Sequence, residues 1–329
     1  MQTSASNPLF LRSSVSPLTR HLIKIRIACL IVAIAVTAGF AQAKEVTLPH
    51  KGLTLNANLE FATGKQLSDG VILITHGALA HRDMETIAYL QKLLKERGYN
   101  TLAINLSLGL NDRHGMYDCA FTQRHTNDDA ADEIGAWVGW LKQQGATRVV
   151  LLGHSRGGAQ TALYAARPGN ALVKAVALMA PATRDNTSAA TYRNNFKQPL
   201  APLLEKAQKL RNSGKGSAVL NKIGLLTCSD TSATADTFLS YYAQNQQESR
   251  LDTPTLLPQI EQPVLVVVAG NDEVVIGLDK KLAPLVDGKH LQMKVIEGSD
   301  HLFRDLSADD AVDAIDAFLK GVGKVAHAR

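Results

Sequence analysis

A serine residue lies inside a glycine-flanked pentapeptide of this 329-residue chain. Residues 149–158 read VVLLGHSRGG and contain the pattern G-x-S-x-G around Ser155. An apolar, β-branched run precedes the pattern and a helix-like segment follows it, which predicts a sharp strand-to-helix turn with an exposed, strained serine hydroxyl. The alternative is a serine that only shapes the turn. We expect Ser155 to be a nucleophile, because the pattern lies in the context that such a turn requires.

A serine hydroxyl is a weak nucleophile unless a base removes its proton. His301 is the best candidate for that base, because it follows the predicted strand 291–296 and would reach the same sheet edge as Ser155. The other histidines beyond residue 43 lie at exposed positions, in loops, inside backbone motifs or near the C-terminus. The alternative role for His301 is that of an exposed loop histidine.

An acid that orients the histidine is expected between the serine and the histidine along the chain. Asp272 fits this order, because it follows the predicted strand 263–269. A carboxylate there would fix the imidazole tautomer and stabilise its charged form. Glu273 is predicted to point elsewhere, and Asp300 to cap its own loop. We therefore assign the third position of the triad to Asp272.

Attack on a carbonyl creates an oxyanion that needs two N–H donors. One donor is expected to be the backbone N–H of Arg156, which follows the nucleophile. The other is expected from the turn 75–78 (THGA) after the predicted strand 71–74, and we choose Ala78, with an ordinary tight turn as the alternative. The Arg156 side chain could favour an anionic substrate, but we expect it to form a structural salt bridge.

Strand-like and helix-like segments alternate along the chain, which indicates a parallel sheet covered by helices on both faces. Strands are predicted at 53–62, 71–74, 101–105, 148–153, 174–180, 263–269 and 291–296, and helices at 84–97, 128–144, 156–166, 278–286 and 307–320. The segment 181–260 breaks this rhythm, since it is rich in Thr, Ser, Asn and Gln and has short helical stretches near 199–211 and 234–246. It is predicted to be an insertion that forms a cap or lid above the sheet edge.

We call the G-x-S-x-G turn at Ser155 the elbow. Along the chain the order is the His76-Gly77 turn, the elbow, Asp272 and His301, and in this order residues 45–320 resemble the α/β-hydrolase family. The resemblance implies an α/β fold with an eight-stranded, mostly parallel sheet and a site at the carboxyl ends of its strands. It also implies cofactor-free hydrolysis through an acyl-enzyme. The elbow and the GSDH stretch that ends at His301 are similar to those of the smaller serine esterases and acyl-hydrolases.

The residue type of the nucleophile excludes some enzyme classes within this family. Ser155 distinguishes the chain from dehalogenases, which need Asp at the elbow, and from dienelactone hydrolases, which need Cys. We expect a serine hydrolase that cleaves a small-molecule carboxylic ester, although a fold does not name its substrate. A peptidase or amidase with the same triad is one alternative, and a binding protein that has lost turnover is another. The intact triad argues against the binding protein.

The first 43 residues have the layout of a secretory signal. Basic residues precede a 14-residue apolar run at 27–40, and the tripeptide AQA at 41–43 follows as a cleavage site. The run is short for a membrane span, which needs about 20 residues, and an uncleaved anchor is the alternative. We expect a signal peptide at 1–43, a hydrolase domain at 44–329 without a stable membrane span, and a periplasmic or secreted location.

Composition excludes several function classes. With 45% hydrophobic and 20% charged residues, the chain is neither disordered nor fibrous. The net charge of +5 comes largely from four basic residues in the predicted signal, since the other 31 basic and 30 acidic residues nearly balance. A nucleic-acid partner would need a clustered basic face, so none is expected. No metal site is expected either, because the sequence lacks C-x-x-C, Cys/His zinc spacing and H-E-x-x-H.

Two cysteines, Cys119 and Cys228, follow the predicted signal. An oxidising compartment permits a disulfide between them, which would pin the insertion to the rest of the domain. Two free, buried thiols are the alternative. Cys119 lies in the segment 109–125, which is rich in polar and aromatic residues and is either a solvated loop or part of a substrate pocket. The candidate pocket residues in it are Arg113, His114 and Tyr117.

Overall fold

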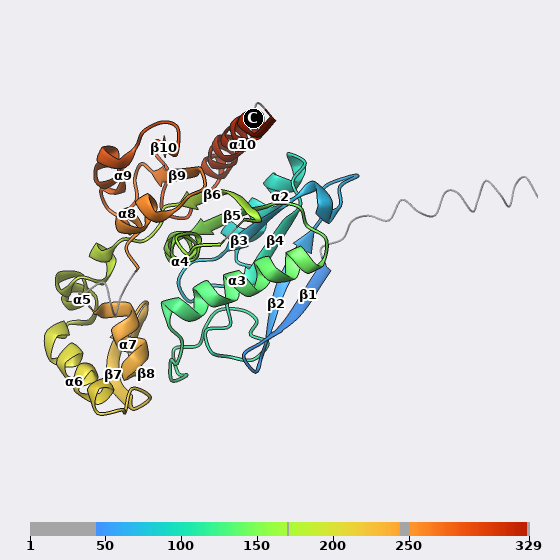
Figure 1. Cartoon of the computed structure of the whole chain (residues 1–329). Helices are drawn as coiled ribbons and strands as arrows, with labels where there is room; N and C mark the ends of the chain where they lie inside the picture. Colours follow the sequence, from blue (N-terminus) through green and yellow to red (C-terminus); the bar gives the residue numbers. More distant parts are fainter. Residues whose placement is uncertain (1–43, 170, 244–250, 328–329) are drawn as a thin grey trace, which may run out of the picture. The chain divides into compact units, whose positions relative to one another are not determined.

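An eight-stranded sheet forms the centre of the protein (Figure 1). The computed structural model describes residues 44–169, 171–243 and 251–327, and the predicted signal peptide at 1–43 lies outside these ranges. The strand order is β1-β2-β4-β3-β5-β6-β9-β10. β2 pairs antiparallel with β1 and with β4, and all other neighbours in the sheet pair parallel. The predicted mostly parallel, eight-stranded α/β fold is therefore confirmed.

The elements closely follow the predicted alternation of strands and helices. The strands are β1 (Lys44–His50), β2 (Leu53–Glu60), β3 (Val71–Thr75), β4 (Thr101–Asn105), β5 (Val149–His154), β6 (Val173–Met179), β7 (Val219–Leu225), β8 (Cys228–Thr234), β9 (Val264–Ala269) and β10 (Leu291–Ile296). The α-helices are α2 (Glu85–Glu96), α3 (Asn127–Gln143), α4 (Ser155–Ala165), α5 (Ala189–Phe196), α6 (Leu200–Asn212), α7 (Ala235–Tyr242), α8 (Thr253–Leu256), α9 (Leu278–Leu282) and α10 (Leu306–His327). Short 3₁₀ helices are η1 (Leu67–Asp69), η2 (Arg184–Thr187), η3 (Leu257–Gln259) and η4 (Ala283–Leu285).

The central strands are apolar on both sides, as parallel strands between two helical layers must be. Every residue of β3, β4 and β9 is buried. Neighbouring residues of a strand point to opposite faces, so Val71 and Leu73 belong to one core and Ile72 and Ile74 to the other.

Helices cover both faces of the sheet (Figure 1). α3 and α4 pack on one face, where Ile134 and Trp137 are fully buried. α2 and α10 pack on the other, through residues such as Leu94 and Ile315. Within the described ranges, no helix is both long and apolar enough to cross a bilayer.

The insertion segment, residues 181–260, builds a small core of its own. Within its described part, α5, α6 and α7 pack around the β7–β8 hairpin, and the rings of Tyr192, Phe238 and Tyr242 contact one another. The sequence pattern does not predict this hairpin, because β8 reads CSDTSAT and lacks an alternation of apolar and polar residues. Pairing with β7 forms the strand instead.

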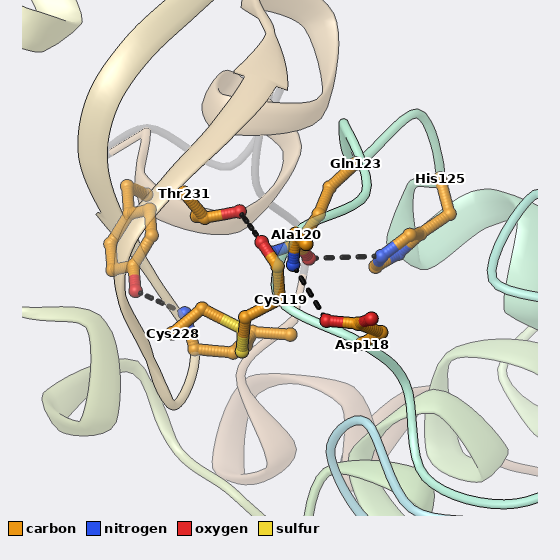
Figure 2. The surroundings of a disulfide bond; sticks show 9 residues. Asp118, Cys119, Ala120, Gln123, His125, Cys228 and Thr231 are labelled. Atoms are coloured by element: carbon orange, nitrogen blue, oxygen red, sulfur yellow. Dashed lines mark hydrogen bonds between the residues drawn. A yellow bond between two sulfur atoms is a disulfide. The ribbon is translucent and has the colours of Figure 1, made fainter.

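A disulfide between Cys119 and Cys228 joins the loop 106–126 to the insertion segment (Figure 2). The two Cα atoms are 5.5 Å apart, and the cysteines are separated by 109 positions in the sequence. The hydroxyl of Thr231 donates to the carbonyl of Cys119 at 2.7 Å. The backbone of Gln123 both donates to and accepts from β8. The predicted disulfide is therefore confirmed, and it lies within a wider seam of hydrogen bonds.

Candidate active site

The chain turns sharply from β5 into α4 at Ser155. β5 ends at His154 and α4 begins at the next residue, so Ser155 lies at the carboxyl end of a central strand. Its φ is 56°, a left-handed backbone conformation that costs free energy for a residue with a Cβ. A Cβ at Gly157 would overlap the carbonyl oxygen of His76, so only glycine permits the close passage of α4 beside β3. The predicted strand-turn-helix geometry is present.

Three predicted residues meet at this turn. The hydroxyl of Ser155 lies 2.8 Å from Nε2 of His301. Nδ1 of His301 lies 2.9 Å from Oδ2 and 3.0 Å from Oδ1 of Asp272. Since a carboxylate only accepts, the proton of His301 is on Nδ1, and Nε2 is free to accept the serine proton. Both partners come from loops after strands that lie on the same side of β5 in the sheet, β9 and β10.

Asp272 is held as a carboxylate. Burial disfavours its charge, but hydrogen bonds from His301 and from two backbone N–H groups outweigh burial, so the pKa of Asp272 lies below its ordinary value. Those N–H groups belong to Val274 and Val275, and each donates to Oδ1 at 2.8 Å. Glu273 is exposed, and Asp300 accepts from the N–H of Leu302 at 3.0 Å, as predicted for a loop cap.

His154 supports His301 in a way that the sequence pattern does not predict. Its Nε2 donates to the backbone carbonyl of His301 at 2.8 Å, and the two rings lie 5.1 Å apart. Burial first, and then the neighbouring His301, lower the pKa of His154 to about 4. His154 is therefore a neutral donor that positions the loop of His301. The only signal in the sequence is its place directly before the serine.

The turn after β3 lies against the nucleophile. A Cβ at Gly77 would lie only 3.3 Å from Cβ of Ser155. The N–H of Ala78 has no hydrogen-bond partner within the described part of the chain. The N–H of Arg156 lies in the first turn of α4, where N–H groups lack partners within the helix. Both predicted oxyanion donors are therefore free to bind a ligand.

An internal network holds the turn after β3. His76 lies at its centre, since Nδ1 donates to the carbonyl of Gly77 at 2.9 Å and Nε2 accepts from the N–H of Leu106 at 3.1 Å. Burial, and then the charge of Arg113, lower the pKa of His76 to about 3. Arg113 donates to the carbonyls of Leu106 and Ala80. Arg113 therefore stabilises the loop from within rather than facing a pocket.

The other two candidate pocket residues differ from each other. His114 is exposed and pairs with the carboxylate of Glu45 at 3.1 Å. Tyr117 is buried, and its hydroxyl has no partner within the described residues.

The side chain of Arg156 departs from expectation. The predicted salt bridge is wrong, because no carboxylate of the described chain pairs with Arg156. The guanidinium faces the ring of Tyr241 instead, with Cζ 5.3 Å from the ring centroid. α7 of the insertion segment supplies this ring, so residues about 85 positions apart meet only through the tertiary fold.

Among the described residues, no three His, Cys, Asp or Glu side chains are grouped so that they could hold a metal ion. The chemistry available here is that of a serine hydroxyl, an imidazole base, an orienting carboxylate and two free backbone donors.

Comparisons with known proteins agree with this geometry. A family model described as "Alpha/beta hydrolase family" matches residues 71–315. Est1E from Butyrivibrio proteoclasticus is similar at 18% identity with a TM-score of 0.59, over 85% of this chain and 99% of that one. The alpha/beta hydrolase GrgF from Penicillium sp. sh18 is similar at 16% identity with a TM-score of 0.61, over 86% and 98%. An esterase domain from a Rhodothermus marinus protein is similar at 18% identity with a TM-score of 0.54, over 84% of this chain and 95% of that one. No curated protein sequence matches significantly.

Proposed function

Because this chain belongs to the alpha/beta hydrolase family, we propose that it is an exported serine hydrolase that cleaves a carboxylic ester through an acyl-enzyme. The observation that carries the proposal is the hydrogen-bonded series from Ser155 through His301 to Asp272. A serine held by a base, with the base held by a carboxylate, is the arrangement that activates a hydroxyl for acyl transfer. The esterase domain among the similar structures supports an ester substrate.

The reaction follows from the positions of the protons. His301 takes the Ser155 proton on Nε2 while Oγ attacks the ester carbonyl, and Asp272 stabilises the imidazolium that forms. The N–H groups of Ala78 and Arg156 donate to the oxyanion. Collapse expels the alcohol, which receives the proton from His301. Water, activated by the same histidine, then releases the acid and restores Ser155.

A panel of chromogenic esters of graded chain length, tested beside peptide amides, decides between hydrolase classes. We expect turnover of esters and little of amides, with none by Ser155→Ala. A fluorophosphonate should label the wild type at Ser155 and leave Ser155→Ala unlabelled. Turnover of amides without esters would favour a peptidase or amidase instead. Absence of both turnover and labelling would favour a binding protein.

Export is the second part of the proposal. The predicted signal layout at 1–43 motivates it, and the disulfide between Cys119 and Cys228 supports an oxidising compartment. N-terminal sequencing of the mature protein should begin at or near Lys44. Recovery of the chain from Met1 in the membrane fraction would instead indicate an uncleaved anchor.

A further inference from the structure

Arg156 carries a buried charge that the proposed mechanism does not use. Its side chain is 7% exposed, and within the described chain it has neither an ion pair nor a hydrogen-bond acceptor. Burial lowers the pKa of Arg156 and outweighs the opposing influence of the neighbouring Tyr241 and Tyr242. A buried guanidinium without an anion is unfavourable. A free, preformed cation directly after the nucleophile therefore points to a ligand that supplies the missing anion.

Three rings in edge-to-face contact lead to Arg156, and we call the set of Tyr117, His125, Tyr241 and Arg156 the wall. The ring centroids of Tyr117 and His125 are 5.6 Å apart, and those of His125 and Tyr241 are 5.5 Å apart. The guanidinium of Arg156 lies over the Tyr241 ring, with Cζ 5.3 Å from its centroid. The wall therefore links the loop 106–126, α7 and the start of α4.

Both ends of the wall are anchored beside Ser155. At one end, the N–H of Tyr117 donates to the carbonyl of Leu79 at 2.9 Å, in the turn whose Gly77 contacts Ser155. At the other end, Arg156 is the residue that follows Ser155 in the first turn of α4. The backbone at both ends of the wall therefore adjoins the elements that hold Ser155.

The wall offers donors and no anion. The hydroxyl of Tyr117 has no partner among the described residues, although it is buried. His125 is neutral, because burial and then the charges of Arg113 and Arg156 lower its pKa to about 3. Its Nδ1 accepts from the hydroxyl of Tyr241 at 2.8 Å. None of the four side chains of the wall is acidic, and the carboxyl groups that act on its tyrosines, Asp118, Asp129 and Glu133, belong to neighbouring residues.

We propose that this wall binds a carboxylate of the substrate, so that the hydrolase acts on esters that carry a carboxylate within a few bonds of the scissile carbonyl. The inference rests on the proposed serine hydrolase function and names its substrate class. The planar guanidinium of Arg156 matches the two oxygens of a carboxylate, and Tyr117 supplies a further donor. The carboxylate could belong to the acid part or to the alcohol part of the ester.

Two pairs of esters test the proposal and locate the charge. The first pair is the p-nitrophenyl monoester of glutaric acid and the ester in which an isopropyl group replaces the free carboxylate. The second pair is the butyrate ester of p-hydroxybenzoate and that of p-hydroxybenzamide. We expect the wild type to prefer the charged member of one pair. In Arg156→Gln, kcat/KM for that member should fall about 10- to 100-fold more than for its neutral partner.

Further variants separate recognition from folding. Arg156→Lys keeps the charge and should lose less selectivity than Arg156→Gln. Tyr117→Phe removes only the unpartnered hydroxyl and should lower selectivity a few-fold without lowering the melting temperature. Arg193→Gln is the matched control, because it changes the net charge equally at an exposed position on α5. It should leave the selectivity unchanged. If Arg156→Gln does not fold, the Lys and Tyr117→Phe variants carry the test.

Binding without turnover distinguishes the two proposals. Calorimetry should detect the binding of monomethyl glutarate or of p-hydroxybenzoate to Ser155→Ala. The affinity should fall about 10-fold or more when Arg156→Gln is added to that variant. Ester turnover with no charge preference, or an equal loss for both members of each pair, would overturn the carboxylate site and leave the hydrolase standing. Arginine-dependent anion binding without any ester turnover would overturn the hydrolase instead.

Discussion

The buried polar groups on the two sides of Ser155 differ in whether they have hydrogen-bond partners. On the triad side, both nitrogens of His301 and both oxygens of Asp272 have partners. On the side of the wall, the guanidinium of Arg156 and the hydroxyl of Tyr117 have none within the described residues. A group that moves protons must be oriented before the substrate arrives. A group that recognises a ligand must instead keep its hydrogen-bonding capacity for it.

Two hydrogen-bonded carboxyl groups, one on each side, differ in the direction of their pKa shifts. Hydrogen bonds outweigh burial at Asp272, and its pKa is lowered. Glu133 of α3 accepts from the N–H of Ser107 at 2.8 Å, yet burial dominates and raises its pKa to about 7. The carboxyl group on the triad side is thus kept charged, while the one beneath the loop 106–126 is largely neutral below pH 7.

Substitution of Ser155 or His301 is expected to have the largest effect on kcat. Ser155→Ala and His301→Ala should each lower kcat for an ester by up to about 10⁶-fold, because neither group works without the other. The double variant should lose little more than either single one. Steady-state and single-turnover kinetics measure this. Multiplicative losses in the double variant would contradict a unit composed of these two residues.

Asp272→Asn should lower kcat by about 10⁴-fold. The amide keeps the shape of the carboxylate, but it can hold the other histidine tautomer and cannot stabilise the imidazolium. Glu273→Gln is the matched control, because Glu273 is exposed and adjacent, and its kcat should equal that of the wild type. Equal losses in the two variants would show that the charge of the loop, rather than the contact with His301, is what matters.

Removal of the disulfide tests the stability of the region on the wall side of Ser155. The double variant Cys119→Ser and Cys228→Ser should lower the free energy of unfolding by about 2–5 kcal/mol, since the bond closes a long loop. Denaturant titration measures the loss, and a reductant should lower the stability of the wild type but not that of the variant. Because the hydrogen bonds of the triad involve neither cysteine, fluorophosphonate labelling of Ser155 should persist. Loss of labelling in the folded variant would contradict that separation.

The smallest expected effect concerns Glu133. Its pKa is raised in the folded protein, so its proton stabilises the fold fully below about pH 4.5, and this contribution is lost as the pH rises to about 7. The loss amounts to about 3 kcal/mol at most. Glu133→Gln should remove this slope, which is measured as the difference between the unfolding free energies of the two proteins at each pH. Parallel curves for the two proteins would mean that the pKa of Glu133 is the same in the folded and unfolded states.

Local patterns determined much of the catalytic side. The continuous apolar runs of β3, β5 and β9 need two covering layers, and so they predict a parallel sheet before any contact is known. Turn chemistry after β5, β9 and β10 then indicates Ser155, Asp272 and His301, because the carboxyl ends of parallel strands share one edge. The hydrogen bond between Ser155 and His301 spans 146 positions, yet strand order and alternation were enough to bring the two together.

Only the tertiary structure determined which residues meet on the wall side of Ser155. The polar strand β8 carries no alternation and forms because β7 and the loop 106–126 pair with it. The sequence contains Arg156 but not its surroundings, since the ring that faces it comes from α7 and the hydroxyl of that ring bonds to His125, 116 positions away. A pattern of residue types reports burial and local conformation. Whether a buried charge finds a partner depends on which distant side chains the fold brings to it.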